Sequence, residues 1–408
     1  MAEILSTLSS DGLAGTPTNG GDRYVSMIAW TADQQQNLIT GGNTGILEGY
    51  RGTTVENGWD ADGVLVETGR VFLNGWDCDE ANPLIIRAAS GQENLGSFSD
   101  GFTIKLPGTA DVIACDDAGV SDLTFQGFHI ISDLNNGTYF RYQDNLRFRR
   151  MIFSGGKAVN KAGIYTRAAG TTLLEISDCI FSATASASCV LMRGAEVYKI
   201  RNSLLKSERY AVQYLSSGTY TADIKNSAFY ASTSWMFNNT AYSGTLDSCA
   251  FNASSITEPA TNSQFNLSIS DAVDFVSPST DNYNPAATGI LRSNAANLTP
   301  LYTTDIALYE RPAAGFWDIG PLQTQGTPTG PTFEGPDIVA QTGIKDSSFT
   351  FNQAGGGTVA DRFTGASSFA YASGSNQPAG ITINPTTGNP EGVPTEAGTF
   401  SITIEGSD

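Results

Sequence analysis

Apolar positions recur in the middle of the chain within a phrase of about ten residues that returns at intervals of 22 to 28 residues. The phrase is seen in LEISDCIFSA, residues 174 to 183, and again in YKIRNSLLKS and ADIKNSAFYA. Its copies begin at Leu123, Leu146, Leu174, Tyr198, Ala222 and Gly244. A repeat at a fixed period is typical of stacked structural units, because a single unit cannot bury its own apolar face.

Three columns of the aligned copies are apolar or small, and the first and third contain mostly large side chains. The first column is Phe125, Phe148, Ile176, Ile200, Ile224 and Leu246. The second is Phe128, Met151, Cys179, Ser203, Ser227 and Cys249. The third is Ile130, Phe153, Phe181, Leu205, Phe229 and Phe251. Between the first two columns stand Gly127, Arg150, Asp178, Asn202, Asn226 and Ser248. Most of these residues favour turns, so each copy predicts a strand, a tight bend and a second strand.

The period and the alternation of apolar and polar positions predict one coil of a right-handed parallel β-helix per copy. Each coil would add about 4.8 Å, the spacing of paired strands. Leucine-rich repeats have a similar period, but their LxxLxL pattern is missing here. The alternative is a β-sandwich, whose strands recur every 8 to 12 residues without such a register. We therefore expect an all-β solenoid in this region.

Composition supports an all-β chain and excludes two classes of partner. The chain has 408 residues, of which 40% are apolar and only 15% charged, with 44 glycines. Many tight turns are typical of this uncharged polar composition. The formal net charge of −19 opposes a nucleic-acid backbone and an anionic membrane surface. We expect neither as a partner, and the charge is consistent with simple solubility.

Cysteine usage and the N-terminus indicate a soluble protein made in a cytoplasm. The five cysteines (Cys78, Cys115, Cys179, Cys189 and Cys249) are scattered without a CxxC pair, which predicts reduced, structural thiols. The first residues, MAEILSTLSSDGLAG, lack the basic and apolar regions of a secretory signal, and no stretch has the length of a membrane span.

Candidate chemistry is sparse. A glycan-cleaving site would require paired carboxylates, for which the candidates are Asp77, Asp79, Glu80, Asp111, Asp116 and Asp117. Carboxylates in loops are ordinary in so acidic a chain. His129 is the only histidine and is expected to be structural, and Asp60-Ala-Asp62-Gly63 is expected to be a turn rather than a calcium loop. We predict no catalytic residue, no metal site and no cofactor.

Aromatic residues between the core phrases are the candidates for binding sugars. They lie where loops should project, so they could stack on sugar rings; burial beneath the loops explains them equally well. The candidates for a glycan-binding surface are Tyr139, Tyr142, Tyr210, Tyr214 and Trp235, with Phe140 and Tyr220 as neighbours of the same kind.

Two stretches resemble pectate-lyase-like β-helix proteins of bacteria and phages. GGDRYVSMIAWTADQQQNLITGGNTGILEGYRG, followed by VFLNGWDCDEANPLIIRAASG, is similar to their opening. TDIALYERPAAGFWDIGPLQ, residues 304 to 323, is similar to their closing phrase, with matches at Asp305, Arg311, Pro312, Asp318, Ile319 and Gly320. The resemblance implies that Trp30 and a helix over residues 31–38 cap the first coil. The acidic and basic motif of calcium-dependent pectate lyases is missing around Arg147, Arg149 and Arg150.

The C-terminal stretch QPAGITINPTTGNPEGVPTEAGTFSITIEGSD resembles a bacterial and phage Ig-like domain family. The matching positions are Gly380, Pro385, Thr387, Gly388, Gly392, Pro394, Gly398 and Thr399. We therefore expect an N-terminal segment and cap over residues 1–45, a β-helix over 46–323, a Pro/Gly/Thr linker over 324–335 and a small Ig-like sandwich over 336–408.

Together the resemblances favour a bacteriophage structural protein on the virion surface. It would be a decoration or fibre protein of the head (capsid) or a component of the tail, and it would give weak adhesion to cell-surface glycans. Proteins of this resemblance are often trimers, so its partners would be its own copies and other virion proteins. The alternatives are a tailspike-type or secreted depolymerase and a bacterial surface adhesin.

Overall fold

In the computed structural model the chain forms two compact units, Met1–Thr324 and Gln325–Asp408. The residues that the structure describes are 2–99, 101–108, 110–133, 135–141, 143–155, 161–167, 173–183, 187–193, 197–214, 220–231, 234–237, 242–253, 260–270, 272–299, 301–312, 315–323, 332–333, 345–349, 351, 359, 363–364, 368–371, 378–397, 400 and 404–407.

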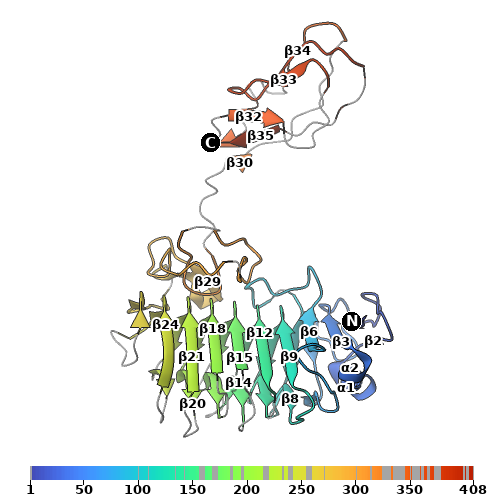
Figure 1. Ribbon diagram of the computed structural model, residues 1–408, viewed down its shortest axis with the longest axis vertical. Helices are drawn as coiled ribbons and strands as arrows, with labels where there is room; N and C mark the ends of the chain where they lie inside the picture. The colour runs from blue at the N-terminus through green and yellow to red at the C-terminus, as the bar shows by residue number, and fades with distance from the viewer. Residues whose placement is uncertain are drawn as a thin grey trace. The chain divides into compact units, whose positions relative to one another are not determined.

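Three long parallel sheets form the first unit, and consecutive coils contribute one strand to each (Figure 1). The eleven-stranded sheet is ordered β2 (Arg23–Tyr24), β1 (Ala2–Leu8), β3 (Asn43–Gly49), β6 (Leu84–Ala88), β9 (Asp122–Gln126), β12 (Asn145–Arg149), β15 (Leu173–Ser177), β18 (Val197–Arg201), β21 (Tyr220–Lys225), β24 (Tyr242–Asp247) and β26 (Ala260–Thr261). The strands β3 to β24 lie side by side in Figure 1.

The other two sheets complete each coil. The nine-stranded sheet is ordered β27 (Gln264–Phe265), β25 (Ala250–Phe251), β22 (Ala228–Ala231), β19 (Leu204–Ser207), β16 (Ile180–Ala183), β13 (Ile152–Gly155), β10 (His129–Ser132), β7 (Thr103–Leu106) and β4 (Leu65–Val66). The seven-stranded sheet is ordered β23 (Ser234–Phe237), β20 (Tyr210–Tyr214), β17 (Ser188–Met192), β14 (Ala162–Thr166), β11 (Thr138–Phe140), β8 (Ile113–Cys115) and β5 (Val71–Phe72). This is the arrangement of a parallel β-helix.

The predicted apolar columns form the core between the sheets. Their strands pair in parallel and in register, so Phe125 lies next to Phe148, and Phe153 next to Phe181. The rings of both pairs stack, with centroids 5.1 Å and 4.7 Å apart. Every member of the three columns is buried. This confirms the prediction of stacked coils, and the antiparallel sandwich alternative is wrong for this region.

The predicted bends also lie where the repeat places them. Asp178, Asn202 and Asn226 have φ values of 53°, 46° and 54°, in the left-handed region that Asn and Asp tolerate better than most residues. Asn226 donates a side-chain hydrogen bond of 3.1 Å to the Oδ1 atom of Asn202 one coil away. The bend column is therefore a ladder of stacked polar side chains as well as a series of turns.

The predicted helix over residues 31–38 is wrong in its bounds. The structure has α1 (Met27–Asp33) and α2 (Leu38–Gly41) instead. The side chain of Ser26 caps the first helix, and the side chain of Asn37 starts a second one by accepting a hydrogen bond from the Thr40 amide. Trp30 is nevertheless buried, with its ring 5.3 Å from that of Trp76.

The segment after the last coil folds back over the nine-stranded sheet. It includes β28 (Phe275–Ser277), the 3₁₀ helix η1 (Pro278–Thr280) and β29 (Asn282–Pro285), the last of which Figure 1 labels beside the coils. Residues 267–322 contribute buried side chains that pack on the outer face of that sheet, among them Phe275, Trp317 and Leu322. We refer to residues 266–323 as the closing segment. No described helix of the chain has the length and apolar character that a membrane crossing requires.

The second unit contains short antiparallel pairs. They are β30 (Thr332–Phe333) with β31 (Phe363–Thr364), β32 (Ser368–Tyr371) with β35 (Ile404–Ser407), and β33 (Ile381–Ile383) with β34 (Pro390–Gly392). Gly380 has φ 83°, and an added Cβ there would lie 2.1 Å from the Val393 carbonyl oxygen, so glycine is required. Gly398 and Thr399 lie outside the described residues.

Candidate binding surface

On the outer face of the eleven-stranded sheet, acidic and basic side chains lie next to one another on neighbouring strands. Arg147, Glu175, Lys199 and Asp223 lie in register on successive strands. The Arg147 Nη1 atom lies 2.6 Å from the Oδ1 atom of the buried Asp122, and Arg147 is also within 4.0 Å of Glu175. Opposite charges on neighbouring strands stabilise the sheet without leaving a field of one sign for a ligand.

The outer face of the nine-stranded sheet is covered. Ile152, Ile180 and Leu204 lie in one outward column, and the closing segment buries all three completely. His129 occupies the same column one coil earlier, where it is 1% exposed and its Nε2 atom lies 2.7 Å from the Ser154 Oγ atom. Burial lowers the pKa of His129 to about 4, so the side chain is neutral at physiological pH. The column of His129, Ile152, Ile180 and Leu204 is therefore covered by the protein itself.

The closing segment is attached to the bend column by specific contacts. The Arg311 Nη2 atom donates a hydrogen bond of 3.0 Å to Asp178 Oδ1, and both side chains are almost fully buried. Burial raises the pKa of Asp178 to about 6, against the opposing charge of Arg311. The guanidinium also lies 5.1 Å from the Trp317 ring. Asn226 Nδ2 donates to the Ala296 carbonyl oxygen, at 2.7 Å. The resemblance had indicated Arg311, but nothing in the sequence identified its partner.

The outer face of the seven-stranded sheet presents two tyrosines at half-buried positions. Tyr139 on β11 and Tyr165 on β14 are register neighbours, and their rings meet edge to face at 5.4 Å between centroids. Arg167 Nη1 donates a hydrogen bond of 3.2 Å to the Tyr139 hydroxyl. Burial raises the pKa of Tyr165, and the nearby Arg193 and Arg167 oppose that shift. The sequence argument named Tyr139 and missed Tyr165, although its place in the register marks it as a neighbour.

The remaining aromatic candidates are dispersed. Tyr214 is 3% exposed and belongs to the core, so it has no surface to offer a sugar. Tyr210, on β20, is partly buried, with the Arg209 guanidinium 5.0 Å from its ring centroid. Trp235 lies within β23, but its side chain is outside the described part of the structure. Tyr142 also lies outside the described residues.

The outward side chains of the seven-stranded sheet are buried in its later coils. Leu191 and Gln213 follow Tyr165 in the outward register, and both are buried. Phe72, which precedes Tyr139 by two coils, is 42% exposed. The accessible part of this face therefore extends over the coils of β5, β11 and β14.

Several of the candidate carboxylates hold the fold together. Asp111 is buried against Arg70 at 2.9 Å and accepts a hydrogen bond from Asn136. Asp117 accepts hydrogen bonds from the amides of Gly75 and Gly119.

The other acidic candidates differ from one another. Asp116 is the exception, because its Oδ1 atom is buried without a hydrogen-bond partner among the described residues. Asp77 binds the Asn37 amide group, Asp79 binds Asn82, and Glu80 lies 4.0 Å from Arg147. The Asp60 side chain accepts hydrogen bonds from the backbone amides of Asp62 and Val64, so residues 60–64 form a turn. In the described residues no group of three or more His, Cys, Asp or Glu side chains is arranged to hold a metal ion.

The five cysteines are buried and unoxidised. Burial raises the pKa of Cys78 to about 11 and that of Cys115 to about 12. It also raises the pKa values of Cys179, Cys189 and Cys249. Thiols of this kind stay protonated and unreactive at neutral pH.

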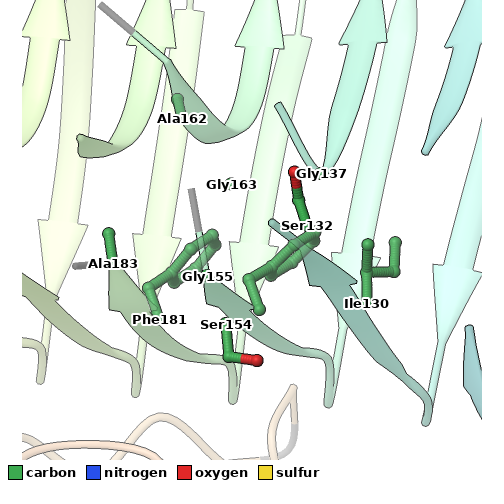
Figure 2. Close-up of a pocket in the computed structure, with 10 residues that line it drawn as sticks. Ile130, Ser132, Gly137, Ser154, Gly155, Ala162, Gly163, Phe181 and Ala183 are labelled. Atoms are coloured by element: carbon green, nitrogen blue, oxygen red, sulfur yellow. The ribbon is translucent and has the colours of Figure 1, made fainter. Parts of the chain in front are cut away.

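The hollows in the described part of the first unit include a small cavity and a larger groove. Figure 2 shows the cavity beside β13 and the first residues of β14, where Gly137 and Gly163 leave space beside Phe181. Its volume of about 10 Å³ is too small for a ligand. A groove of about 470 Å³ lies between residues 95–99 and the β29 hairpin, with Phe98, Asp281 and Tyr283 in its lining. Asp281 is the one carboxylate among its described lining residues, so the groove has no acid–base pair.

A comparison of the sequence with protein-family models found no match, and a comparison with curated proteins found none either.

Proposed function

We propose that this protein is a structural component of a bacteriophage particle, displayed on the particle surface as a head decoration or fibre protein or as part of the tail. In this proposal the first unit is a right-handed parallel β-helix and the second is an Ig-like β-sandwich. The proposal rests on the resemblances of the opening, closing and C-terminal phrases and on the use that the fold makes of its polar residues.

The observation that carries a non-catalytic role is the engagement of most of the candidate carboxylates, with the Oδ1 atom of Asp116 as the exception. Paired carboxylates of a glycosidase must face a shared groove, one of them free to protonate the leaving group. Here Asp111 is bound to Arg70, Asp117 to two backbone amides and Asp79 to Asn82. Side chains held in this way stabilise loops. They support a protein that displays a surface over one that cleaves a polysaccharide.

Weak adhesion to cell-surface glycans is the second part of the proposal. Many copies on one particle would give useful avidity even where each copy binds weakly. The accessible tyrosines, Tyr139 and Tyr165, support this role because an aromatic ring offers an apolar face and a polar hydroxyl to a sugar. We further propose a homotrimer, in which the partners of each chain are its copies and other virion proteins.

The location is tested by gold-labelled antibodies against the protein on particles purified from a lysate. We expect label at regular positions on the head or on the tail. Protein that is absent from purified particles would overturn the proposal, and label on the bacterial envelope would favour an adhesin.

The activity is tested by incubating the purified protein with host capsule or cell-wall polysaccharide. We expect no new reducing ends and no loss of polymer length. Release of reducing ends at a catalytic rate would replace the adhesion proposal with that of a depolymerase.

A further inference from the structure

Three arginines lie in a single column beside the accessible tyrosines. Arg141, Arg167 and Arg193 are each the first residue after β11, β14 and β17. The Arg167 amide donates a hydrogen bond of 2.7 Å to the Phe140 carbonyl oxygen. The Arg193 amide donates one of 3.0 Å to the Thr166 carbonyl oxygen. The ladder of the seven-stranded sheet therefore continues through these residues, and successive arginines are separated by about 4.8 Å in backbone position.

The tyrosines and the arginines form one surface. Arg167 is hydrogen-bonded to the Tyr139 hydroxyl, and both Arg167 and Arg193 are near enough to act on the pKa of Tyr165. Arg167 and Arg193 are exposed to solvent. We call Tyr139, Tyr165, Arg167 and Arg193 the Arg–Tyr stripe.

The arginines of this stripe differ from those of the eleven-stranded sheet in their charged partners. On the eleven-stranded sheet, Arg147 has Asp122 as its partner and Arg201 has Asp223. Neither Arg167 nor Arg193 has a carboxylate within 4.0 Å among the described residues. The chain as a whole carries 41 acidic residues against 22 basic ones. Stacked like charges on neighbouring strands destabilise a sheet, so the exposed neighbours Arg167 and Arg193 are better explained by an external anion than by the fold.

We infer that the Arg–Tyr stripe binds an acidic polysaccharide, with its carboxylate or sulfate groups on the guanidiniums and its sugar rings against the tyrosines. A column with a regular spacing suits a ligand that itself repeats along one direction. Guanidinium groups bind planar carboxylates through paired hydrogen bonds and are weakly hydrated, which suits an exposed site. This inference rests on the adhesion proposed above and specifies its ligand class.

A nucleic acid is the other polyanion that these arginines could attract, and the charges argue against it. Binding a nucleic-acid backbone depends on many phosphate contacts over a broad basic surface. A chain with a net charge of −19 repels such a partner at long range. A polysaccharide with one charge per sugar, such as polygalacturonate, has a lower charge density than a DNA duplex and is repelled less.

The test is the binding of the full chain to polygalacturonate, with neutral dextran as the uncharged comparison. The variant R167Q/R193Q removes two charges from the stripe, and R149Q/K199Q removes two from the outer face of the eleven-stranded sheet. We expect the first double variant to bind polygalacturonate about tenfold more weakly and the second to bind as the unchanged protein does. Binding should weaken with added salt, and dextran should not compete.

Three results would overturn the inference. The first is that the unchanged protein does not bind polygalacturonate, and the second is that the two double variants lose affinity equally. The third is that a DNA fragment competes better than the polysaccharide, which would identify a nucleic acid as the partner. Any of them leaves display on the particle intact, because antibody labelling measures that separately. Thermal unfolding of both variants verifies that a loss of binding is not a loss of folding.

Discussion

The nine-stranded and the seven-stranded sheets are built from strands of the same coils, but the outer face of the first is covered and that of the second is partly accessible. One bears an apolar column, Ile152, Ile180 and Leu204, which the closing segment covers. The other bears Tyr139 and Tyr165 at half-buried positions, followed by a column of arginines. Because a parallel strand exposes every second side chain, the outward residue decides whether a face is packed or displayed. Stability should therefore depend on the first face and binding on the second.

The largest effect is expected where the closing segment is anchored by a buried ion pair. Arg311→Met leaves the Asp178 carboxylate buried without its partner, which we expect to lower the free energy of unfolding by about 3–5 kcal/mol. The measurement is chemical denaturation at neutral pH. The pKa of Asp178, already raised by burial to about 6, should rise further in the variant. Its folded pKa then lies above its unfolded one, so stability is lost as the pH rises through this range and is partly regained on acidification.

The matched control is the double variant D178N/R311M. Asn occupies the same bend at Asn202 and Asn226 with the same left-handed backbone, so it should fit at residue 178. We expect the double variant to recover much of the stability that R311M loses, and to lose the dependence on acid. A double variant as unstable as the single one would show that the ion pair is not what anchors the segment.

Truncating one apolar side chain on each face should lower the free energy of unfolding by different amounts. Leu204→Ala on the covered face should lower the free energy of unfolding by about 2–5 kcal/mol, since the side chain is completely buried and leaves a cavity. Phe72→Ala on the seven-stranded face should lower it by about 1 kcal/mol or less, because that ring is 42% exposed. Equal losses in denaturant titrations of the two variants would contradict the assignment of the covered face.

Acid should weaken the covered face through its histidine. The pKa of His129 is lowered by burial from an ordinary 6.5 to about 4. The unfolded state then binds the proton more readily, so the contribution to stability is present above pH 6.5 and is lost as the pH falls toward 4. The loss is roughly 3 kcal/mol. Comparing the pH dependence of unfolding with that of His129→Gln isolates this contribution, and parallel curves would exclude it.

The smallest effect is expected on the displayed face. R167Q/R193Q should change the free energy of unfolding by about 0.5 kcal/mol or less, since both side chains are exposed. Thermal unfolding of the two proteins checks this. A large loss would mean that the arginines support the fold, and the contrast between the two faces would fail.

Much of the first unit could be predicted because its information is local and repeated. The columns at Phe125, Cys179 and Phe181 determine which side chains face inward, and Asp178 marks the bend. The break between the two N-terminal helices was missed, because a single capping side chain at Asn37 outweighed the continuous pattern. Tyr214 shows the limit of loop reasoning. The sequence leaves its projection and its burial equally plausible, and the register of β20 directs it inward.

The sequence by itself determined the period of the coil, its inward columns and its bends, since each depends on neighbours within one repeat. Only the tertiary structure decided which outer face is covered, which partner Arg311 has and that three arginines share a column. Arg311 and Asp178 are 133 residues apart, and Arg141, Arg167 and Arg193 come from three coils. Contacts of this kind arise from the register between coils and from the path of the closing segment. Neither property belongs to a single repeat, so the sequence pattern alone does not contain them.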